Sequence, residues 1–156
     1  MKQIKFFVTF LVVVSLAFSG CNKNTDNNNP SGISGSLSLK YDGTNWTATN
    51  VQATFVNDIV NVAGIDNNNH QATITLEGIS QIGTYLVGPG NPSNQLSWTE
   101  GTNPEDVYQA NWTIGSGSVV VTLLSDAKIE GTFQFTGYNI NQDSTVVTEG
   151  KFSAGL

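Results

Sequence analysis

The spacing of strand-forming residues limits most strongly how this chain can fold. After Gly35, no stretch carries apolar residues at the i, i+3, i+4, i+7 spacing of an amphipathic helix. Short runs rich in Val, Ile, Thr and Phe are instead separated by Gly, Asn, Asp and Pro. The pattern predicts an all-β domain, an antiparallel meander of about ten strands that closes into a barrel or folds into a two-sheet sandwich, since either closure hides the edges and the apolar face.

Two consecutive hairpins follow from the rule that apolar residues of neighbouring strands share one face. The first turns at Asn57 and Asp58, two residue types that tolerate a positive φ. The second turns over the three asparagines at 67–69, which makes Asp66 and His70 neighbours. The expected cross-strand pairs are Phe55 with Val60, Ala53 with Val62, Val51 with Gly64, Val62 with Ile74 and Val60 with Leu76.

A further pair of hairpins is predicted in the second half of the domain, with a turn at Ser116-Gly117 and a loop at 125–127. Trp112, Val121 and Gly131 then form one cross-strand row, in which the indole covers the missing side chain of Gly131. We therefore expect Trp112 in the core. The other expected pairs are Ile114 with Val119, Ala110 with Leu123, Leu123 with Ile129 and Val119 with Phe133, and further strands are expected at 36–41, 44–50, 83–87, 96–99 and 145–153.

The N-terminal residues are typical of an export signal that ends in a lipid-modified cysteine. A positive start precedes the apolar run Phe6–Ser19, which is shorter than the roughly 20 residues that a bilayer-spanning helix needs. Residues 16–21, LAFSGC, resemble the lipobox of bacterial lipoproteins, which predicts cleavage before Cys21 and acylation of its thiol. The expected parts of the chain are a signal peptide at 1–20, a flexible tether at 21–35 and a single β domain at 36–156.

The same segment predicts the location of the protein. Acylated Cys21 would anchor it in the outer membrane. Some surface-exported lipoproteins carry a cluster of acids just after the cysteine, whereas here only Asp26 follows it, so we expect the periplasmic face. Cys21 is also the only cysteine of the chain, and no disulfide is therefore expected.

The charge of the chain excludes nucleic acid as an expected partner. After removal of the signal peptide, four lysines stand against twelve acids, a balance of −8, and the chain has no arginine. This balance repels nucleic acid and anionic lipid headgroups. The lack of arginine also removes the bidentate fork that commonly recognises phosphate or carboxylate. The expected partners are the membrane, through Cys21, and a glycan or a protein.

Residues that support catalysis are few. His70 is the only histidine, and no Gly-x-Ser-x-Gly elbow is present, so a Ser–His mechanism has no support. The run Asp66–Asn69 lacks the alternating acids and the distal Glu of a calcium loop. Glu130 alternates with inward residues on a predicted strand and is expected to point to solvent. We expect no enzymatic activity, no metal site and no cofactor.

One long segment, Gly88–Asp106, interrupts the predicted strands and holds three of the four prolines. Loops of this length in compact domains are usually functional or disordered. Its aromatic ring and polar groups match the mixture that binds sugars, which makes the candidate ligand-binding residues Trp98, Asn91, Asn94, Glu100 and Asn103. In the alternative interpretation, Trp98 shares strand parity with Leu96 and packs in the core.

Four short Gly-aromatic motifs resemble those of a group of small, uncharacterised Bacteroidetes-type lipoproteins assigned to a domain of unknown function. The motifs are Asp42–Ala48, Gly83-Thr84-Tyr85, Gly131-Thr132-Phe133 and Gly150-Lys151-Phe152. The resemblance spans about residues 35–156, implies an all-β envelope lipoprotein and transfers no catalytic residue. Asp143-Ser144-Thr145 also resembles the acceptor motif for O-glycosylation in this bacterial group, so Ser144 is a candidate glycosylation site.

Two functions from different classes fit these features. The first is a membrane-anchored, non-catalytic binding or structural module of the cell envelope, with a glycan as the candidate ligand. The alternative is a carrier similar to the calycins, which holds a small apolar molecule inside a β-barrel. Inward packing of Trp112, Phe133, Phe135 and Phe55 would fill the interior and exclude the carrier.

Overall fold

Eleven antiparallel strands form a single continuous sheet in the computed structural model, which describes residues 35–156. The predicted signal peptide, Cys21 and the tether up to residue 34 lie outside the described residues. The strands are β1 (Ser36–Tyr41), β2 (Thr44–Thr47), β3 (Asn50–Val56), β4 (Ile59–Ile65), β5 (Gln71–Glu77), β6 (Gly83–Val87), β7 (Gln95–Thr99), β8 (Val107–Ala110), β9 (Ser116–Ser125), β10 (Lys128–Tyr138) and β11 (Ser144–Gly155), with one 3-10 helix, η1 (Pro104–Asp106). The all-β prediction is confirmed.

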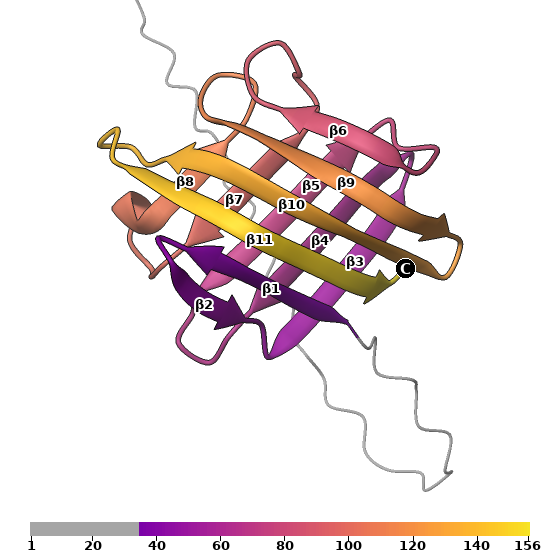
Figure 1. The fold of residues 1–156 in the computed structure, drawn as a ribbon, viewed down its shortest axis with the longest axis horizontal. Helices are drawn as coiled ribbons and strands as arrows, with labels where there is room; N and C mark the ends of the chain where they lie inside the picture. The colour runs from indigo at the N-terminus through magenta and orange to yellow at the C-terminus, as the bar shows by residue number, and fades with distance from the viewer. Residues whose placement is uncertain (1–34) are drawn as a thin grey trace, which may run out of the picture. The chain divides into compact units, whose positions relative to one another are not determined.

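The sheet curls into a half-barrel with two layers. One layer has the order β2-β1-β11-β10-β9-β6, and the other has the order β8-β7-β5-β4-β3. Figure 1 shows the first layer crossing in front of the second. The layers are joined where β10 extends past β9 and pairs with β8, through Tyr138 and Gln109. This junction places β8, η1 and the β10–β11 turn at one end of the domain.

The two hairpins of the β3–β4–β5 region have the predicted register. Phe55 pairs with Val60 across β3 and β4, and Val60 pairs with Leu76 across β4 and β5. Asn57 and Asp58 have φ values of 52° and 62°, the left-handed conformation that a two-residue hairpin turn requires. Short-range turn chemistry and the alternation of apolar residues therefore determine this part of the fold.

The hairpin predicted at Ser116-Gly117 is wrong. β8 ends at Ala110, and β9, which starts at Ser116, pairs with β6 and β10. The chain turns earlier because the Asn111 side-chain oxygen accepts hydrogen bonds from the backbone N–H groups of Thr113 and Ile114. Such side-chain-to-backbone bonds compete with strand pairing. Trp112 lies in this turn with 62% of its surface exposed, so its predicted core position is also wrong.

The β9–β10 hairpin agrees with the predicted register only away from its turn. Val121 pairs with Gly131 and Val119 with Phe133, as expected. Nearer the turn, a register shift between Glu130 and Gly131 pairs Leu123 with Glu130 instead of Ile129. The side chain of Leu123 is consequently 37% exposed. A bulge of this kind inserts one residue into a strand and cannot be found by aligning apolar residues alone.

Apolar side chains fill the space between the two layers. Phe133 and Phe135 are buried there as predicted, whereas Phe55 is 38% exposed near the tip of the β3–β4 hairpin. β6 lies between β5 and β7 in the sequence but does not pair with either of them. It pairs with β9 and so belongs to the first layer. The largest fully buried side chains are Trp98, Leu37, Ile74, Leu76, Ile79, Leu96 and Ile129.

Candidate functional site

Trp98, the aromatic residue of the predicted sugar site, is fully buried. Its ring lies 4.7 Å from that of Tyr41, 5.0 Å from that of Trp46 and 5.8 Å from that of His70, measured between centroids. Its Nε1 donates a hydrogen bond to Glu100 Oε1 at 3.0 Å. Trp98 thus has the core position that strand parity with Leu96 indicated, and it presents no face on which a sugar could stack.

The other four predicted residues do not form one site, because β7 runs through the middle of the segment. Asn91 and Asn94 precede this five-residue strand, and Glu100 and Asn103 follow it, so the two pairs are separated by roughly 16 Å of extended chain. The Asn94 amide bonds the backbone of β5 and β6, at Glu77 and Leu86. Asn103 donates to Asp106 Oδ2 and caps η1.

Asp66 is the centre of a hydrogen-bond cluster beside Trp98. Its Oδ2 accepts from Trp46 Nε1 at 2.9 Å and lies 2.8 Å from His70 Nδ1. Its Oδ1 accepts from the backbone N–H groups of Asn68 and His70 at 2.7 and 2.9 Å. Burial acts most strongly and opposes ionisation, but these hydrogen bonds together outweigh it and lower the pKa of Asp66 from 3.8 to about 2.

The chemistry of this cluster is structural. An ionised Asp66 orients the imidazole of His70, as the acid of a catalytic triad orients the histidine base. Between residues 35 and 156, however, no serine or threonine hydroxyl is hydrogen-bonded to His70. The cluster instead closes the β4–β5 turn and joins it to β2 through Trp46.

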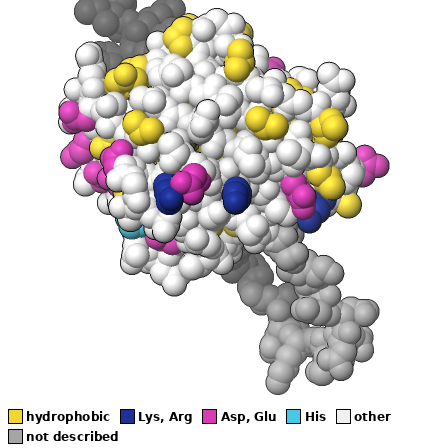
Figure 2. Space-filling view, in the orientation of Figure 1, with side chains coloured by type: hydrophobic (Ala, Val, Ile, Leu, Met, Phe, Trp, Pro, Cys, Tyr) yellow, Lys and Arg dark blue, Asp and Glu magenta, His cyan; other side chains and the backbone are white. Residues whose placement is uncertain are grey.

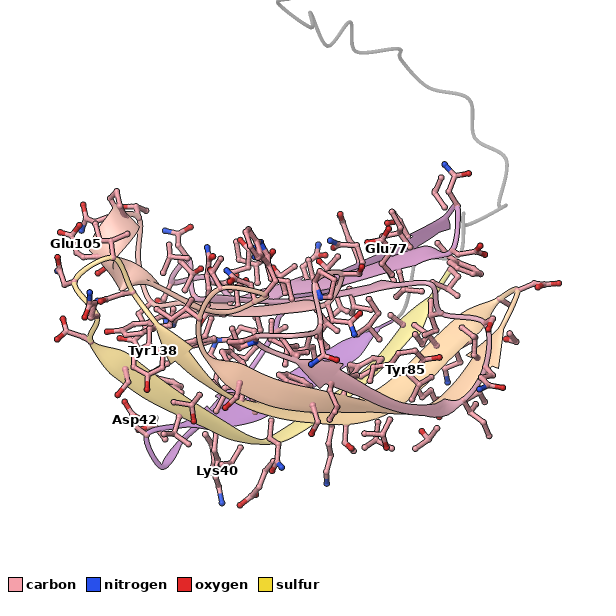
Figure 3. The ribbon with its side chains drawn as sticks, turned by 90° about the horizontal axis from the view of Figure 1, so that it is seen from above. Lys40, Asp42, Glu77, Tyr85, Glu105 and Tyr138 are labelled. Atoms are coloured by element: carbon pink, nitrogen blue, oxygen red, sulfur yellow. The ribbon has the colours of Figure 1, made fainter. Side chains whose placement is uncertain are left out.

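A groove of about 410 Å³ lies where the two layers join. It is bounded by η1 and β8 on one side and by the end of β10 and its turn on the other. Figure 3 shows Glu105, Tyr138 and Asp42 at this end of the domain. The lining residues are Pro104, Val107, Gln109, Asn111, Thr113, Ile114, Tyr138, Asn139 and Ile140.

A network around Asn139 holds the two walls of the groove together. This residue is only 7% exposed. Its Nδ2 donates to the carbonyl oxygen of Glu105 at 2.8 Å, which ties the β10–β11 turn to η1. Its Oδ1 accepts from the backbone N–H groups of Asn141 and Asp143 at 3.0 and 2.9 Å. All of these bonds are local to the groove and make it a preformed feature of the fold.

The groove combines apolar and hydrogen-bonding surfaces. Tyr138 supplies an aromatic side chain, and Gln109, Asn111 and Asn139 supply amides. Trp112, which the sequence placed in the core, lies in the turn between the lining residues Asn111 and Thr113 and is largely exposed. Sites with a mainly apolar surface and a few convergent polar groups are the usual form of small-ligand sites.

The end of the domain that contains the groove is acidic around Tyr108. Burial raises the pKa of the Tyr108 hydroxyl, and the carboxylates of Glu100, Asp143, Asp42 and Asp106 raise it further. These four acids come from separate parts of the chain, and the fold gathers them at this end. A negative potential at this end disfavours anionic ligands.

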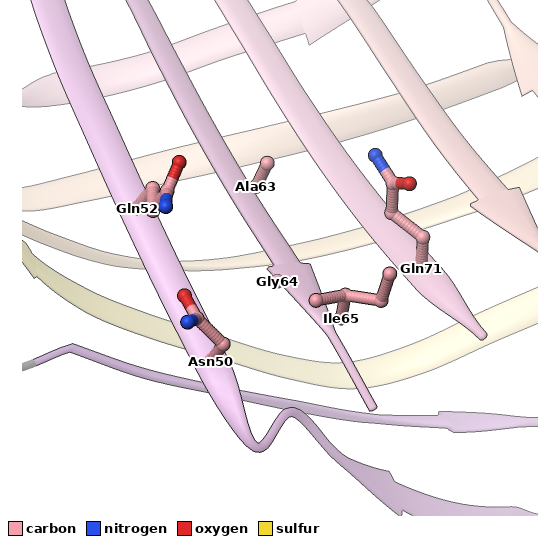
Figure 4. Close-up of a pocket in the computed structure, with 6 residues that line it drawn as sticks. All are labelled: Asn50, Gln52, Ala63, Gly64, Ile65 and Gln71. Carbon is pink, nitrogen blue, oxygen red and sulfur yellow. The ribbon is translucent and has the colours of Figure 1, made fainter. Parts of the chain in front are cut away.

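A smaller hollow on the outer face of β3, β4 and β5 offers less chemistry. It encloses about 250 Å³, and Figure 4 shows the amides of Asn50, Gln52 and Gln71 around Ala63 and Ile65. No aromatic ring lines it. The groove at the layer junction is therefore the better candidate for a ligand site.

Residues 35–156 contain neither a metal-binding cluster nor a membrane-spanning helix. That part of the chain contains no group of three or more His, Cys, Asp or Glu side chains placed to hold a metal ion. None of its helical segments has the length and apolar character of a membrane span.

Ser144, the predicted glycosylation site, is exposed at the start of β11, whereas Thr145 is buried and donates to Asp42. The glycosylation of Ser144 stays a prediction.

The chain belongs to a family described as a domain of unknown function, DUF6252, whose model matches residues 33–155. The match covers all eleven strands. No curated protein and no solved structure matches the chain.

Proposed function

We propose that this protein is a membrane-anchored, non-catalytic binding module of the cell envelope whose ligand is an uncharged glycan. The binding site in this proposal is the groove between β8, η1 and the end of β10. Acylated Cys21 would provide the anchor, and the periplasmic face of the outer membrane would be its location.

The observation that carries the proposal is the combination of groups in the groove. Sugars present apolar C–H faces that pack on aromatic rings and hydroxyl groups that need several donors and acceptors. Tyr138 supplies a ring, and Gln109 and Asn111 supply amides that both donate and accept. Trp112 does not line the groove, but it is largely exposed and lies in the chain between the lining residues Asn111 and Thr113. The acidic surroundings favour an uncharged ligand over an acidic one.

The alternative of an internal carrier finds less support in the packing. A carrier needs an empty interior, whereas Trp98, Phe133 and Phe135 occupy the space between the layers. The groove is formed by surface side chains and the backbone around them, so a ligand there would bind from outside the half-barrel.

A glycan array with the full-length protein tests the proposal. Neutral oligosaccharides should bind, and Trp112→Ala should weaken the binding by about tenfold or more, since exposed Trp residues often dominate binding energy. Because Trp112 is largely exposed, the melting temperature should change little. Phe55→Ala is the matched control, because it removes another partly exposed ring that lies outside the groove.

Two results would contradict the proposal. One is an array on which no neutral glycan binds the wild-type protein. The other is binding that survives Trp112→Ala and Gln109→Ala unchanged, which would place the glycan outside the groove.

A further inference from the structure

A second hollow, of about 360 Å³, lies on the outer face of β1, β2 and β11, and its lining is rich in hydrogen-bond donors. Lys40 projects from this side of the domain in Figure 3. The outward side chains around the hollow are Ser38, Lys40, Asn45, Thr47, Glu149 and Lys151.

Strand register aligns these side chains in two adjacent rows. In the first row, Ser38 of β1 pairs with Thr47 of β2 on one side and with Lys151 of β11 on the other. In the second row, Lys40 pairs with Asn45 of β2. Directly paired residues on one face of a sheet have Cβ atoms about 5 Å apart, so one small group can reach several of them.

A bulge in β11 shapes the side of the hollow next to Lys40. The register between β1 and β11 shifts between Ser38 and Lys40, and Thr148 and Glu149 both lie outside the core. Glu149 has a φ of 51°, which is uncommon for a residue other than glycine within a strand. Bulges and such conformations occur often where a strand re-aims a side chain at a functional site.

The lysines of this face differ in their partners. Lys40 Nζ lies 2.7 Å from Glu149 Oε1, and Lys128 is paired with Glu130. Lys151 makes no ion pair with any residue of the described domain, although that domain has eleven acids and three lysines. In Figure 2 the lysine atoms lie in a short band across this face. The hollow therefore contains a positive charge that has no ion-pair partner among residues 35–156.

We propose that this hollow binds one anionic oxygen group, a carboxylate or a phosphate monoester, of a small ligand. Lys151 supplies the charge, and Ser38, Asn45 and Thr47 donate hydrogen bonds from the surrounding rows. Glu149 is held by Lys40 and limits the positive charge of the site. A polyanion is disfavoured, because Lys151 supplies a single positive charge and the domain as a whole has a negative balance.

This site is independent of the groove proposed for glycans. The groove lies at the acidic end, where an anion is disfavoured, and shares no lining residue with the hollow on β1, β2 and β11. Loss of one activity should leave the other unchanged.

An NMR titration of the full-length protein with galacturonate, inorganic phosphate and galactose tests the proposal. An anion should shift the backbone amide signals of Ser38, Thr47 and Lys151, and uncharged galactose should not. Comparison of galacturonate with phosphate identifies the preferred anion. Lys151→Gln should weaken anion binding by at least about threefold, while Glu149→Gln frees Lys40 and should strengthen it by a similar factor.

Lys128→Gln is the matched control, because it removes a lysine from β10 that does not line the hollow. This variant should bind the anion as wild type does. Equal weakening by Lys128→Gln and Lys151→Gln would show diffuse charge attraction and overturn the proposal. Absence of any shift with both anions, or tighter binding after Lys151→Gln, would also overturn it.

Discussion

Phe152 of β11 lies over Gly131 of β10, so closely that a Cβ atom on residue 131 would be 2.7 Å from Cζ of Phe152. The arrangement is repeated in reverse two pairs further along, where Phe133 covers Gly150. The two phenyl rings are 6.3 Å apart. An aromatic ring thus fills the space that each glycine leaves, a known way to stabilise glycine in a sheet. The sequence predicted this role for Trp112, and the structure assigns it to Phe152.

Gly131→Ala should destabilise the domain by about 1 to 3 kcal/mol, the usual cost of adding a methyl group to a well-packed core. The new Cβ would meet both the Phe152 ring and the carbonyl oxygen of Val120. Urea unfolding measures the change. Thr132→Ala, at an exposed position of the same strand, is the control and should cost less. Equal midpoints for the two variants would contradict the packing described.

Trp98→Ala should lower the stability of the domain, and Trp112→Ala should leave it almost unchanged. Trp98 is fully buried, so its removal should cost about 3 to 5 kcal/mol of stability. Trp112 is 62% exposed, and its removal should change stability by less than about 0.5 kcal/mol. Chemical denaturation of both variants checks the pair. A large loss for Trp112→Ala would support the hairpin at Ser116-Gly117 over the turn at Asn111.

Asp66 should make stability depend on acid pH. Its pKa falls from 3.8 to about 2 on folding, so the ionised carboxylate stabilises the fold above about pH 4. That contribution, about 2 kcal/mol, should be lost as the pH decreases from about 4 to 2. Urea unfolding at several pH values should show the loss in wild type and a flatter profile in Asp66→Asn.

Trp46→Phe refines the test of Asp66, because it keeps a ring in the core and removes one N–H donor to the carboxylate. The acid-dependent loss should be smaller in this variant than in wild type. Profiles of Asp66→Asn and wild type that run parallel between pH 2 and 5 would show that Asp66 does not titrate as described.

Asn139→Ala should weaken the wall of the groove. The change leaves the backbone N–H groups of Asn141 and Asp143 without their acceptor and removes the bond to Glu105. A cost of about 1 kcal/mol is expected, because these hydrogen bonds are only part-buried. Hydrogen exchange should become faster at residues 141 and 143. Unchanged exchange there would mean that the Asn139 network does not hold the turn.

Cys21→Ser should abolish lipid labelling and release the protein from the membrane fraction, because the serine hydroxyl does not replace the acylated thiol. Labelling with a fatty-acid analogue and cell fractionation measure the two effects. Labelling that persists in the variant would refute the lipobox interpretation.

Sequence reasoning succeeded where local rules agree with one another. The hairpin at Asn57 and Asp58 has two residues that accept a positive φ, flanked by strictly alternating apolar residues, and each signal indicates the same register. The strands predicted at 83–87 and 96–99 are also present, as β6 and β7, from the composition of short strand-forming runs between turn residues.

The same reasoning failed around Trp112 because two turns competed there. Ser116-Gly117 aligned apolar residues well, but the Asn111 side chain closes an earlier turn through bonds that the hydrophobic pattern does not contain. The bulge between Glu130 and Gly131 likewise moves Leu123 out of its predicted pairing with Ile129. At the bulge, a single residue of offset exchanges the inner and outer faces of the strand.

The amino-acid sequence by itself determined the strand content, the β3–β4–β5 register and the burial of Phe133 and Phe135, since these depend on neighbours close along the chain. Only the tertiary structure decided which residues form the groove and the lysine-lined hollow. Tyr138 meets Gln109, and Lys151 meets Ser38, because strands far apart in the sequence become neighbours when the sheet curls. Side chains that point outward carry little hydrophobic signal, so the pattern that predicts a core does not predict the surface between strands.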